Sequence, residues 1–219
     1  MRSALCKRYN IPPDAVFAVA GTVGVGKSTF TTALAQALGF KVSMEKVDGN
    51  PYLDRYYGDF NRWSFHLQVY FLAERFKEQK RLFQYGGGFI QDRSIYEDTA
   101  IFAQMNYDNG TMALEDFETY TSLFQAMVMT PYFRPPDLII YLEGDFRDIL
   151  ERVQKRGRPS ELATDPSYWK DLYDRYGQWI ETFTQAPVLR LNIKAYDLFG
   201  DEDSLTSLLK KISNILKKE

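Results

Sequence analysis

One short stretch of the sequence restricts the fold more than any other, the nine residues Gly21-Thr-Val-Gly-Val-Gly-Lys-Ser-Thr29. They follow the apolar run from Val16 to Ala20 and lead into a segment with helical spacing that begins at Lys27. This is a complete G-x-x-x-x-G-K-[ST] pattern in the strand, loop and helix context that the pattern requires. Its glycines let the backbone wrap so that N–H groups and the helix N-terminus face phosphate oxygens. The stretch therefore predicts a phosphate-binding loop.

We assign this loop, residues 21–29, to the phosphates of ATP or GTP. Lys27 would place a positive charge on the β- and γ-phosphates, and Ser28 would offer its hydroxyl to Mg²⁺. The residues expected to bind nucleotide here are Gly21, Thr22, Val23, Gly24, Val25, Gly26, Lys27, Ser28 and Thr29. The loop alone leaves open whether the γ-phosphoryl group passes to water or to another substrate.

The composition fits one cytoplasmic α/β domain. The chain has 219 residues, of which 45% are hydrophobic, so it can bury one sizeable core. Lys and Arg total 27 against 29 for Asp and Glu, so the chain has no net basic field to hold a nucleic-acid backbone or an anionic membrane surface. A single cysteine and a single histidine exclude a disulfide framework and a zinc cluster. No apolar run approaches the roughly 18 residues of a membrane helix, and no signal peptide is evident.

Short apolar runs alternate with longer segments of helical spacing. The runs have the length of buried strands and span residues 16–20, 41–44, 88–91, 138–141 and 187–191. The helical segments span residues 27–38, 63–83, 97–106, 116–129, 146–155, 167–184 and about 203–218. This alternation predicts a mostly parallel five-stranded sheet with helices on both faces. Only the first dozen residues and the Lys-rich end are expected to be loosely held.

Charged residues follow two of the predicted strands at their carboxyl ends, where ligands bind in such sheets. Asp92 and Arg93 come directly after the third strand, and Glu45 comes just after the second. A carboxylate at Glu45 could accept a proton from an acceptor hydroxyl, although a glutamate at a strand end is also common on any surface. Ser94 is expected to cap the next helix, from which Asp98 would project about one turn later.

Three arginines, Arg152, Arg156 and Arg158, lie at the end of a predicted helix and in the Gly-Pro loop that follows it. Arginines on a mobile loop suit the charge that spreads over phosphoryl oxygens during transfer. Basic residues in a last helical turn can also serve only the helix dipole. A regulatory GTPase is disfavoured, because the chain has no Asn-Lys-x-Asp and its Asp-x-x-Gly, residues 197–200, follows the fifth strand.

Gln68 and Arg75 lie seven residues apart in the apolar segment Phe65-His-Leu-Gln-Val-Tyr-Phe-Leu-Ala-Glu-Arg-Phe76 and so share a helix face. A buried amide and guanidinium need partners, and Asp98 is the obvious partner for Arg75. One interpretation is a structural ion pair beside a core glutamine. The other is a base pocket, since an amide matches the donor and acceptor of adenine N6 and N7. Cytosine shows a comparable pair, so Gln68 alone does not separate the two bases.

Together these motifs resemble the deoxynucleoside kinase family, in particular its bacterial deoxyadenosine and deoxyadenosine/deoxycytidine kinases. The resemblance runs from about residue 11 to residue 198. It is carried by the phosphate loop, by Glu45 before the segment Asn50-Pro-Tyr-Leu53, by the helix containing Gln68, by Asp92-Arg93-Ser94 and by the Arg156-Gly-Arg158 lid. It implies the P-loop kinase fold, with the sheet flanked by helices and an Arg-rich lid at about residues 152–165 of one domain spanning 1–219.

The resemblance also implies a role for each matching residue. Catalysis would fall to Glu45 as base, with Arg93, Lys27, Arg152 and Arg156. The deoxynucleoside would contact Glu45, Tyr57, Gln68, Arg75, Arg93, Asp98, Phe102 and Glu161, with Tyr57 and Glu161 at the 3′-hydroxyl and little room left for a 2′-hydroxyl. Arg156, Arg158, Tyr196 and Asp197 would contact ATP, and Ser28 and Asp92 would hold Mg²⁺. Asp92 stands where the family often has the longer Glu. Family members are usually homodimers.

We therefore expect transfer of the γ-phosphoryl of ATP to the 5′-hydroxyl of a deoxyribonucleoside, with deoxyadenosine preferred and deoxycytidine as a second substrate. Two alternatives stay open. Deoxyguanosine could be the main substrate, because Asp98 could accept a hydrogen bond from guanine N1–H. A nucleoside monophosphate kinase shares the loop and the lid, but it would need further cationic groups for the acceptor phosphate, which Glu45 would repel.

Overall fold

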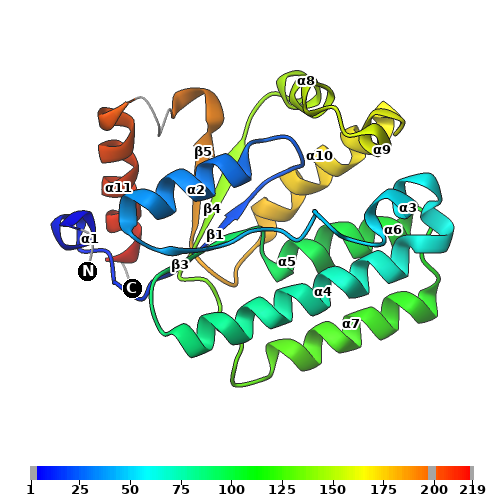
Figure 1. Cartoon of the computed structure of the whole chain (residues 1–219), viewed down its shortest axis with the longest axis horizontal. Helices are drawn as coiled ribbons and strands as arrows, with labels where there is room; N and C mark the ends of the chain where they lie inside the picture. The colour runs from blue at the N-terminus through cyan, green and yellow to red at the C-terminus, as the bar shows by residue number, and fades with distance from the viewer. Residues whose placement is uncertain (1–3, 197–200, 218–219) are drawn as a thin grey trace.

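The computed structural model describes residues 4–196 and 201–217, and a five-stranded parallel sheet runs through its centre (Figure 1). The strands are β1 (Val16–Ala20), β2 (Lys41–Ser43), β3 (Phe89–Asp92), β4 (Leu138–Glu143) and β5 (Val188–Asn192). They lie in the order β2-β3-β1-β4-β5, and every neighbouring pair is parallel. The predicted parallel sheet flanked by helices is therefore confirmed.

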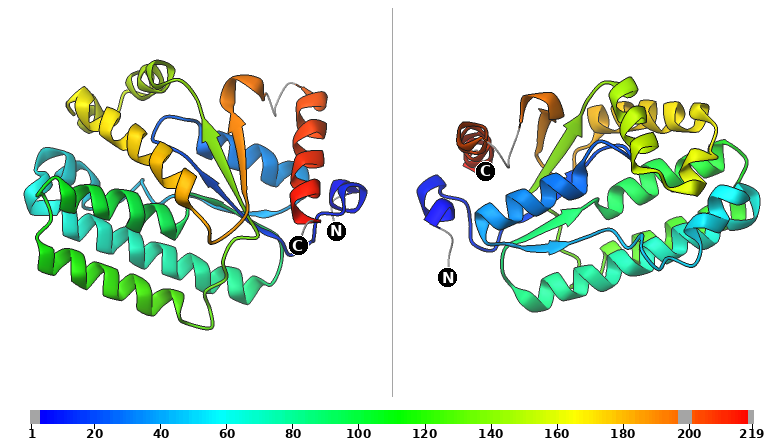
Figure 2. Two further views of the ribbon diagram at one scale, coloured as in Figure 1. Left: turned by 180° about the vertical axis from the view of Figure 1, so that it is seen from behind. Right: turned by 45° about the horizontal axis from the view of Figure 1, so that its top comes forward.

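Helices cover both faces of the sheet (Figure 2). They are α1 (Ala4–Tyr9), α2 (Lys27–Leu38), α3 (Leu53–Gly58), α4 (Phe60–Tyr85), α5 (Ile95–Glu97), a π-helical turn (Asp98–Ala103), α6 (Gln104–Asp108), α7 (Leu114–Val128), α8 (Phe146–Arg156), α9 (Pro159–Leu162), α10 (Pro166–Thr182), a 3₁₀ turn (Ile193–Ala195) and α11 (Glu202–Leu216). No helix within the described ranges is long and apolar enough to cross a membrane.

The period-two alternation of β1 divides the core between the two faces. Phe17 and Val19 pack into a cluster with side chains of α1, α2 and α11. Ala18 and Ala20 face the other way, into a cluster built mainly from α10, with further side chains from β4, α6, α8 and the π-helical turn. Since both faces are covered, β1 is buried along its whole length, which explains its continuous apolar sequence.

The N-terminal residues differ from the expectation of a loosely held end. Cys6 and Tyr9 of α1 are buried in the core, and Ile11 is buried after them. The helix α1 packs against both α2 and α11. The apolar side chains of this segment are widely spaced among charged ones, so its periodicity gave little indication that it packs against α2 and α11.

The long helix α4 and the helix α7 lie side by side below the sheet in Figure 1, and they contact each other. A capping hydrogen bond from the backbone N–H of Arg62 to Asp59 begins α4, and Gly86 in a left-handed conformation ends it. On its sheet side α4 contacts the π-helical turn that contains Asp98. This contact brings the polar side chains of α4 to the carboxyl end of β3.

Candidate active site

The phosphate loop connects β1 to α2, and its shape depends on glycine. Gly21 has a φ of 142° and Gly24 a φ of 85°, which disfavour any side chain. A Cβ atom on Gly21 would lie 2.6 Å from the carbonyl oxygen of Leu142. On Gly24 it would lie 2.7 Å from a methyl group of Val153. The loop is therefore held close to β4 and α8, at the N-terminus of α2 where an anion is favoured.

Lys27 begins α2 and folds back across this loop. Its Nζ donates hydrogen bonds to the carbonyl oxygens of Gly21 at 2.7 Å and Thr22 at 3.0 Å. Burial, and after it the charge of Arg93, lowers the pKa of Lys27 to about 8. A buried ammonium whose hydrogen bonds go to neutral carbonyls would gain from a nearby anion. Lys27 is thus placed to bind a phosphate group over the loop.

Ser28 and Asp92 meet between the start of α2 and the end of β3. The hydroxyl of Ser28 donates to Oδ2 of Asp92 at 2.5 Å, and the buried Oδ1 has no hydrogen-bond partner in the described part of the chain. No cluster of three metal-ligating side chains occurs among the described residues. Mg²⁺ usually takes one or two protein ligands and completes its shell with phosphate oxygens and water. A hydroxyl and a free carboxylate oxygen beside the loop fit that ion.

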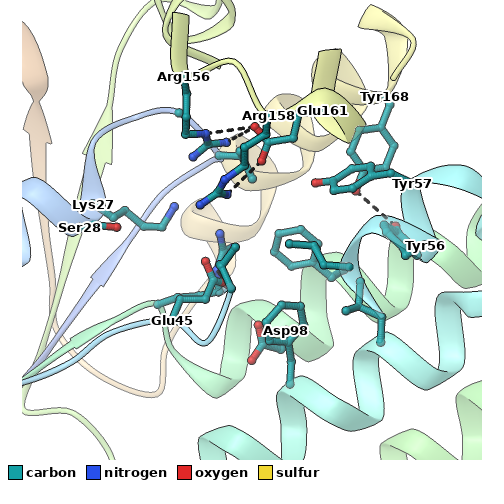
Figure 3. Close-up of a pocket in the computed structure, with 18 of the residues that line it drawn as sticks. Lys27, Ser28, Glu45, Tyr56, Tyr57, Asp98, Arg156, Arg158, Glu161 and Tyr168 are labelled. Carbon is teal, nitrogen blue, oxygen red and sulfur yellow. Dashed lines mark hydrogen bonds and ion pairs between the residues drawn. The ribbon is translucent and has the colours of Figure 1, made fainter. Parts of the chain in front are cut away.

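Glu45 lies beyond the end of β2 (Figure 3), and its carboxylate contacts two arginines. Its Oε1 lies 2.7 Å from Nε of Arg93 and 3.4 Å from Nη2 of Arg75. Burial alone would raise the pKa of Glu45, but the charges of Arg93, Arg75 and Lys27 outweigh it and leave that pKa below its ordinary value. The carboxylate is therefore ionised at neutral pH and can accept a proton.

Arg93 follows β3 with a φ of 74°, a conformation that non-glycine residues rarely adopt. Its backbone N–H donates to the carbonyl oxygen of Val19, which extends the pairing of β3 with β1 by one residue. The guanidinium is buried, with its centre 4.6 Å from the centroid of the Phe102 ring. Such strain at a strand end commonly marks a functional position.

Arg75 lies behind the cavity and ties α4 to the neighbouring elements. Its Nε donates to Oδ2 of Asp98 at 2.9 Å, and its Nη1 donates to the carbonyl oxygen of Asp92 at 3.0 Å. Both side chains are almost fully buried. Burial would lower the pKa of Arg75, but Asp98 and then Glu45 raise it, so the guanidinium stays charged. The predicted pairing of Arg75 with Asp98 is present.

Gln68 lies two turns before Arg75 on α4, with its side chain in a cavity of about 340 Å³ that also borders the phosphate loop. Gln68 is 2% exposed, and its Oε1 has no hydrogen-bond partner among the described residues. An unpaired buried amide oxygen costs about 1 to 3 kcal/mol. Phe71 and Phe102 line the same cavity. The amide with these rings is suited to a flat polar ligand such as a base.

The end of α8 and the helix α9, the segment for which the sequence predicts a lid, carry the arginine cluster. Arg156 Nη2 lies 2.6 Å from Oε2 of Glu161, and Arg158 Nη1 lies 3.1 Å from Oε1 of the same carboxylate (Figure 3). Arg152 donates from Nη1 to the carbonyl oxygen of Val25 in the phosphate loop at 3.2 Å. Glu161 is buried although both arginines are about one-third exposed. One carboxylate therefore joins the two arginines at the cavity.

Tyr57 projects from α3 into the space beneath the lid (Figure 3). Burial, and after it the charge of Glu161, raises the pKa of Tyr57, so the hydroxyl keeps its proton. Its neighbour Tyr56 is held by Tyr168 of α10, with the two hydroxyls 3.3 Å apart, and by Oδ1 of Asn106 at 3.0 Å. This contact fixes α3 relative to α10, and with it the position of Tyr57.

The cavity thus brings together predicted residues from distant parts of the chain. They are Val23, Gly24, Gly26, Lys27, Ser28, Thr29, Glu45, Tyr57, Gln68, Arg93, Asp98, Phe102, Arg152, Arg156, Arg158 and Glu161. Gly21, Thr22, Val25, Arg75 and Asp92 are not among its lining residues. Tyr196 lines an adjacent cavity of about 260 Å³ together with Val25, Thr29 and Arg152. Asp197 lies outside the described residues.

Sequence reasoning missed one buried carboxylate at this site, that of Glu97. It is fully buried at the end of α5, and its Oε2 accepts from the backbone N–H of Ser94 at 2.8 Å. Its Oε1 accepts from the backbone N–H of Gly21 at 3.3 Å and from the hydroxyl of Tyr176 at 2.9 Å. The Ser94-x-x-Glu97 spacing is that of a capping box and was the available signal. Tyr168, which also lines the cavity, carried no such signal.

Comparisons with known proteins show which family this chain is similar to. The deoxynucleoside kinase family pattern matches residues 17–217. The chain is 59% identical over 210 residues to the deoxyadenosine/deoxycytidine kinase of Bacillus subtilis, covering 96% of this chain and 97% of that protein. It is 35% identical to the deoxyguanosine kinase of Lactobacillus acidophilus, covering 93% and 91%.

The structure of deoxyadenosine kinase from M. mycoides with bound dATP superimposes with a TM-score of 0.77 at 29% identity, covering 90% of this chain and 98% of that one. Both the sequence pattern and the fold therefore extend over nearly the whole chain. The chain belongs to the deoxynucleoside kinase family.

Proposed function

We propose that this deoxynucleoside kinase transfers the γ-phosphoryl group of ATP to the 5′-hydroxyl of deoxyadenosine, with deoxycytidine as a second substrate. The observation that carries the proposal is the buried, unpaired amide oxygen of Gln68 in the cavity that also borders the phosphate loop. The 59% identity to a deoxyadenosine/deoxycytidine kinase supports the choice of bases.

The base would bind between the aromatic side chains with its polar edge on Gln68. An amide offers a donor and an acceptor side by side, which match N6 and N7 of adenine and a comparable pair on cytosine. Asp98, held by Arg75, is the second polar group on that side. Guanine would present a carbonyl where adenine has an amine, so deoxyguanosine is the alternative substrate that the test must include.

The sugar would lie under the lid with its 3′-hydroxyl between Tyr57 and Glu161. Tyr57 keeps its proton and can donate, whereas Glu161 can only accept when ionised. A 3′-hydroxyl both donates and accepts, so this pair satisfies it. The ring of Tyr57 would occupy the space that a ribose 2′-hydroxyl needs, which favours deoxyribose.

Phosphoryl transfer would begin with the 5′-hydroxyl next to Glu45. The carboxylate accepts the hydroxyl proton, the 5′-oxygen forms a bond to the γ-phosphorus, and the bond from that phosphorus to the β-phosphate oxygen breaks to release ADP. Arg93 pairs with Glu45 and keeps it ionised before the transfer. The contribution of such a base is about 10² to 10⁴ in rate.

The triphosphate would lie over the phosphate loop, where Lys27 and the lid arginines neutralise its charge. Arg156 and Arg158 share Glu161 as their carboxylate, so they already point under the lid. Ser28 and Asp92 would hold Mg²⁺, which supplies further charge neutralisation when it binds with ATP. Tyr196 would contact the adenine ring of the donor from the adjacent cavity.

The test is product formation by the purified protein with Mg-ATP and, in parallel, deoxyadenosine, deoxycytidine, deoxyguanosine, thymidine, adenosine and dAMP. Monophosphate from deoxyadenosine and deoxycytidine, with little from adenosine, is the expected result. Faster turnover of deoxyguanosine than of deoxyadenosine would overturn the base assignment of Gln68. Phosphorylation of dAMP alone would remove Glu45 as the base and identify a monophosphate kinase.

We propose further that the chain acts in the cytoplasm as a homodimer of single domains spanning residues 1–219, each with the loop at 21–29 and the lid at about 152–165. The exposed apolar side chains Leu114 and Leu123 of α7 and Met129 beyond it support this, Met129 being 82% exposed. Light scattering after size-exclusion chromatography would give the mass in solution. A particle of one chain's mass would refute the dimer.

A further inference from the structure

Glu97 is a buried carboxylate that the transfer reaction described above does not use. It is 0% exposed, and it is the acceptor in each of its four hydrogen bonds. Oε2 accepts from the backbone N–H and the hydroxyl of Ser94, at 2.8 and 3.1 Å. Oε1 accepts from the backbone N–H of Gly21 and the hydroxyl of Tyr176, at 3.3 and 2.9 Å. Two of the donors are backbone groups that cannot accept, so the site requires an acceptor at both oxygens.

These contacts join three elements that must stay aligned during catalysis. Gly21 is the first residue of the phosphate loop after β1, and Ser94 follows Arg93 at the end of β3. Tyr176 belongs to α10, the helix that follows the lid. One carboxylate therefore sets the distance between the donor phosphates and the strand end that carries Arg93.

The hydrogen bonds also have a direction that reaches Arg93. Tyr176 gives its only hydroxyl proton to Glu97, so the lone pairs of its oxygen are free to accept from Nη1 of Arg93. Arg93 in turn contacts Glu45 through Nε. The chain of contacts runs from Glu97 through Tyr176 and Arg93 to Glu45, and Glu97 itself lies 3.8 Å from the guanidinium.

We propose that Glu97 is a positioning residue for phosphoryl transfer. Through Tyr176 it holds the guanidinium of Arg93 against Glu45, and through the N–H of Gly21 it fixes the start of the phosphate loop relative to them. The inference rests on the proposed roles of Glu45 and Arg93. If Glu97 acted only as the second half of a helix cap, its loss would affect stability and leave turnover unchanged.

A glutamine at this position is a sharp probe, because it has the same shape but only one acceptor oxygen. Turned one way, its NH₂ group faces the N–H of Ser94. Turned the other way, the NH₂ group faces the hydroxyl of Tyr176 and the N–H of Gly21. The Tyr176 hydroxyl then loses the oxygen that accepted its proton. Either orientation leaves donors opposed. Tyr176→Phe removes only the link between Glu97 and Arg93 that passes through the tyrosine hydroxyl, and it leaves the cap at Ser94 and the direct contact of Glu97 with Arg93 in place.

The experiment compares steady-state kinetics of the full chain as wild type, Glu97→Gln, Tyr176→Phe and the double variant, with deoxyadenosine and Mg-ATP. Expected is a fall in kcat of about 10- to 100-fold for Glu97→Gln, the equivalent of one unsatisfied buried donor. The KM for deoxyadenosine should stay within about threefold, because neither residue lines the cavity. The double variant should resemble Glu97→Gln rather than show the product of both effects.

The matched control is Glu78→Gln on α4, a buried carboxylate with its own arginine, Arg81, but without a contact to the site. It should keep the wild-type kcat. A spectroscopic readout that needs no turnover is the side-chain Nε–H resonance of Arg93 in ¹⁵N-arginine-labelled protein. That resonance should shift in Glu97→Gln and in Tyr176→Phe and stay unchanged in the control.

The proposal would be overturned by a wild-type kcat in both site variants, by equal changes in kcat and KM, or by an unmoved Arg93 resonance in folded Tyr176→Phe. If Glu97→Gln does not fold, Tyr176→Phe alone decides through its kcat and its Arg93 resonance. Failure of the proposed function gives a different pattern, since the wild type would then phosphorylate no deoxynucleoside while the resonance still shifted.

Discussion

Replacement of Glu45 by glutamine separates proton transfer from the rest of the proposed reaction. The amide has the shape of the carboxylate and can still accept a hydrogen bond from Arg93, but it cannot take the proton of the 5′-hydroxyl. Arg75 keeps its ion pair with Asp98, and Arg93 keeps Tyr176 and the nearby Glu97. Because both guanidinium groups retain partners, the cavity should keep its shape in the variant.

The magnitude follows from what the carboxylate supplies. A positioned general base contributes about 10² to 10⁴ in rate, which corresponds to roughly 2.7 to 5.4 kcal/mol of transition-state stabilisation. We expect kcat of Glu45→Gln to fall by that factor. The KM for deoxyadenosine should change by less than about fivefold, since the variant keeps the contacts proposed for the base at Gln68 and for the sugar under the lid.

The assay is steady-state production of dAMP, with thermal unfolding of each variant to show that it is folded. Glu45→Asp serves as a second variant, because it keeps a carboxylate but withdraws it by one methylene. Its kcat should lie between the kcat of the wild type and that of Glu45→Gln. A kcat within threefold of the wild type in folded Glu45→Gln would refute the reasoning, whatever the KM.

The pH dependence gives an independent check on the same residue. Although burial acts to raise the pKa of Glu45, its cationic neighbours leave it below the ordinary value, so the carboxylate stays ionised as the pH falls from 8 to 6. A group with a lowered pKa loses its charge only in more acidic solution. The profile of kcat/KM should therefore show no acidic limb from Glu45 in this range. An acidic limb near pH 6.5 that disappears in Glu45→Gln would contradict the lowered pKa.

Four further perturbations have defined outcomes. Gln68→Ala should raise the KM for deoxyadenosine and deoxycytidine together by about tenfold, measured at saturating ATP. A change confined to the KM for ATP would mean that Gln68 on α4 contacts the phosphoryl donor instead of the base. Arg156→Lys should lower kcat by about 10-fold or more, because lysine loses the two-nitrogen contact seen with the lid carboxylate, and an unchanged kcat would exclude a role in transfer. Asp92→Asn should raise the Mg²⁺ concentration for half-maximal rate about tenfold in a metal titration, and an unaltered titration would exclude Asp92 as a ligand. Leu34→Ala, at a fully buried position, should lower the unfolding free energy by about 2 to 5 kcal/mol, while Lys210→Ala, at an exposed position of α11, should change it by less than about 0.5 kcal/mol in the same denaturant titration.

The sheet was predictable because its strands are short, buried on both faces and almost continuously apolar. The run from Val16 to Ala20 is found with its predicted bounds, and the other strands differ by one or two residues at their ends. The phosphate loop was predictable because it requires glycine at defined positions. Where a residue type is dictated by backbone geometry, a single sequence is sufficient to locate it.

Two features of the site were beyond the sequence pattern. The predicted helix from residue 97 to 106 is instead a short helix, a π-helical turn and a second short helix. The wider turn carries Asp98 and Phe102, and such insertions often occur at functional sites. The positive φ of Arg93 is likewise set by tertiary contacts, since nothing in its local sequence favours a left-handed residue. Local periodicity does not encode either departure.

The short helices α3 and α9 were missed for a related reason. Each is too short to show a helical period, and the two contact each other in addition to α4 and α8. Ser160 of α9 donates to Asp54 of α3 at 2.8 Å. Their positions therefore depend on a contact between residues more than a hundred positions apart, which no window of sequence contains.

The charges of the site divide in a way that bears on which acceptor it takes. On the acceptor side the cationic groups are already paired, Arg75 with Asp98 and Arg93 with Glu45. A phosphate group bound there would have to displace the carboxylate of Asp98 or Glu45 or lie next to it and be repelled. Because Coulomb interactions between buried groups are screened less than in water, that encounter is unfavourable.

On the donor side two of the cations, Lys27 and Arg152, have neutral partners. Lys27 donates to the carbonyls of Gly21 and Thr22, and Arg152 donates to the carbonyl of Val25. At these two cations a triphosphate replaces weak dipolar partners with full negative charges without breaking an ion pair, whereas Arg156 and Arg158 already share the carboxylate of Glu161. The same cavity is thus charged for a polyphosphate at one end and balanced for a neutral molecule at the other. This asymmetry favours a nucleoside over a nucleoside monophosphate as acceptor, and it predicts that dAMP is a poor substrate even where deoxyadenosine is a good one.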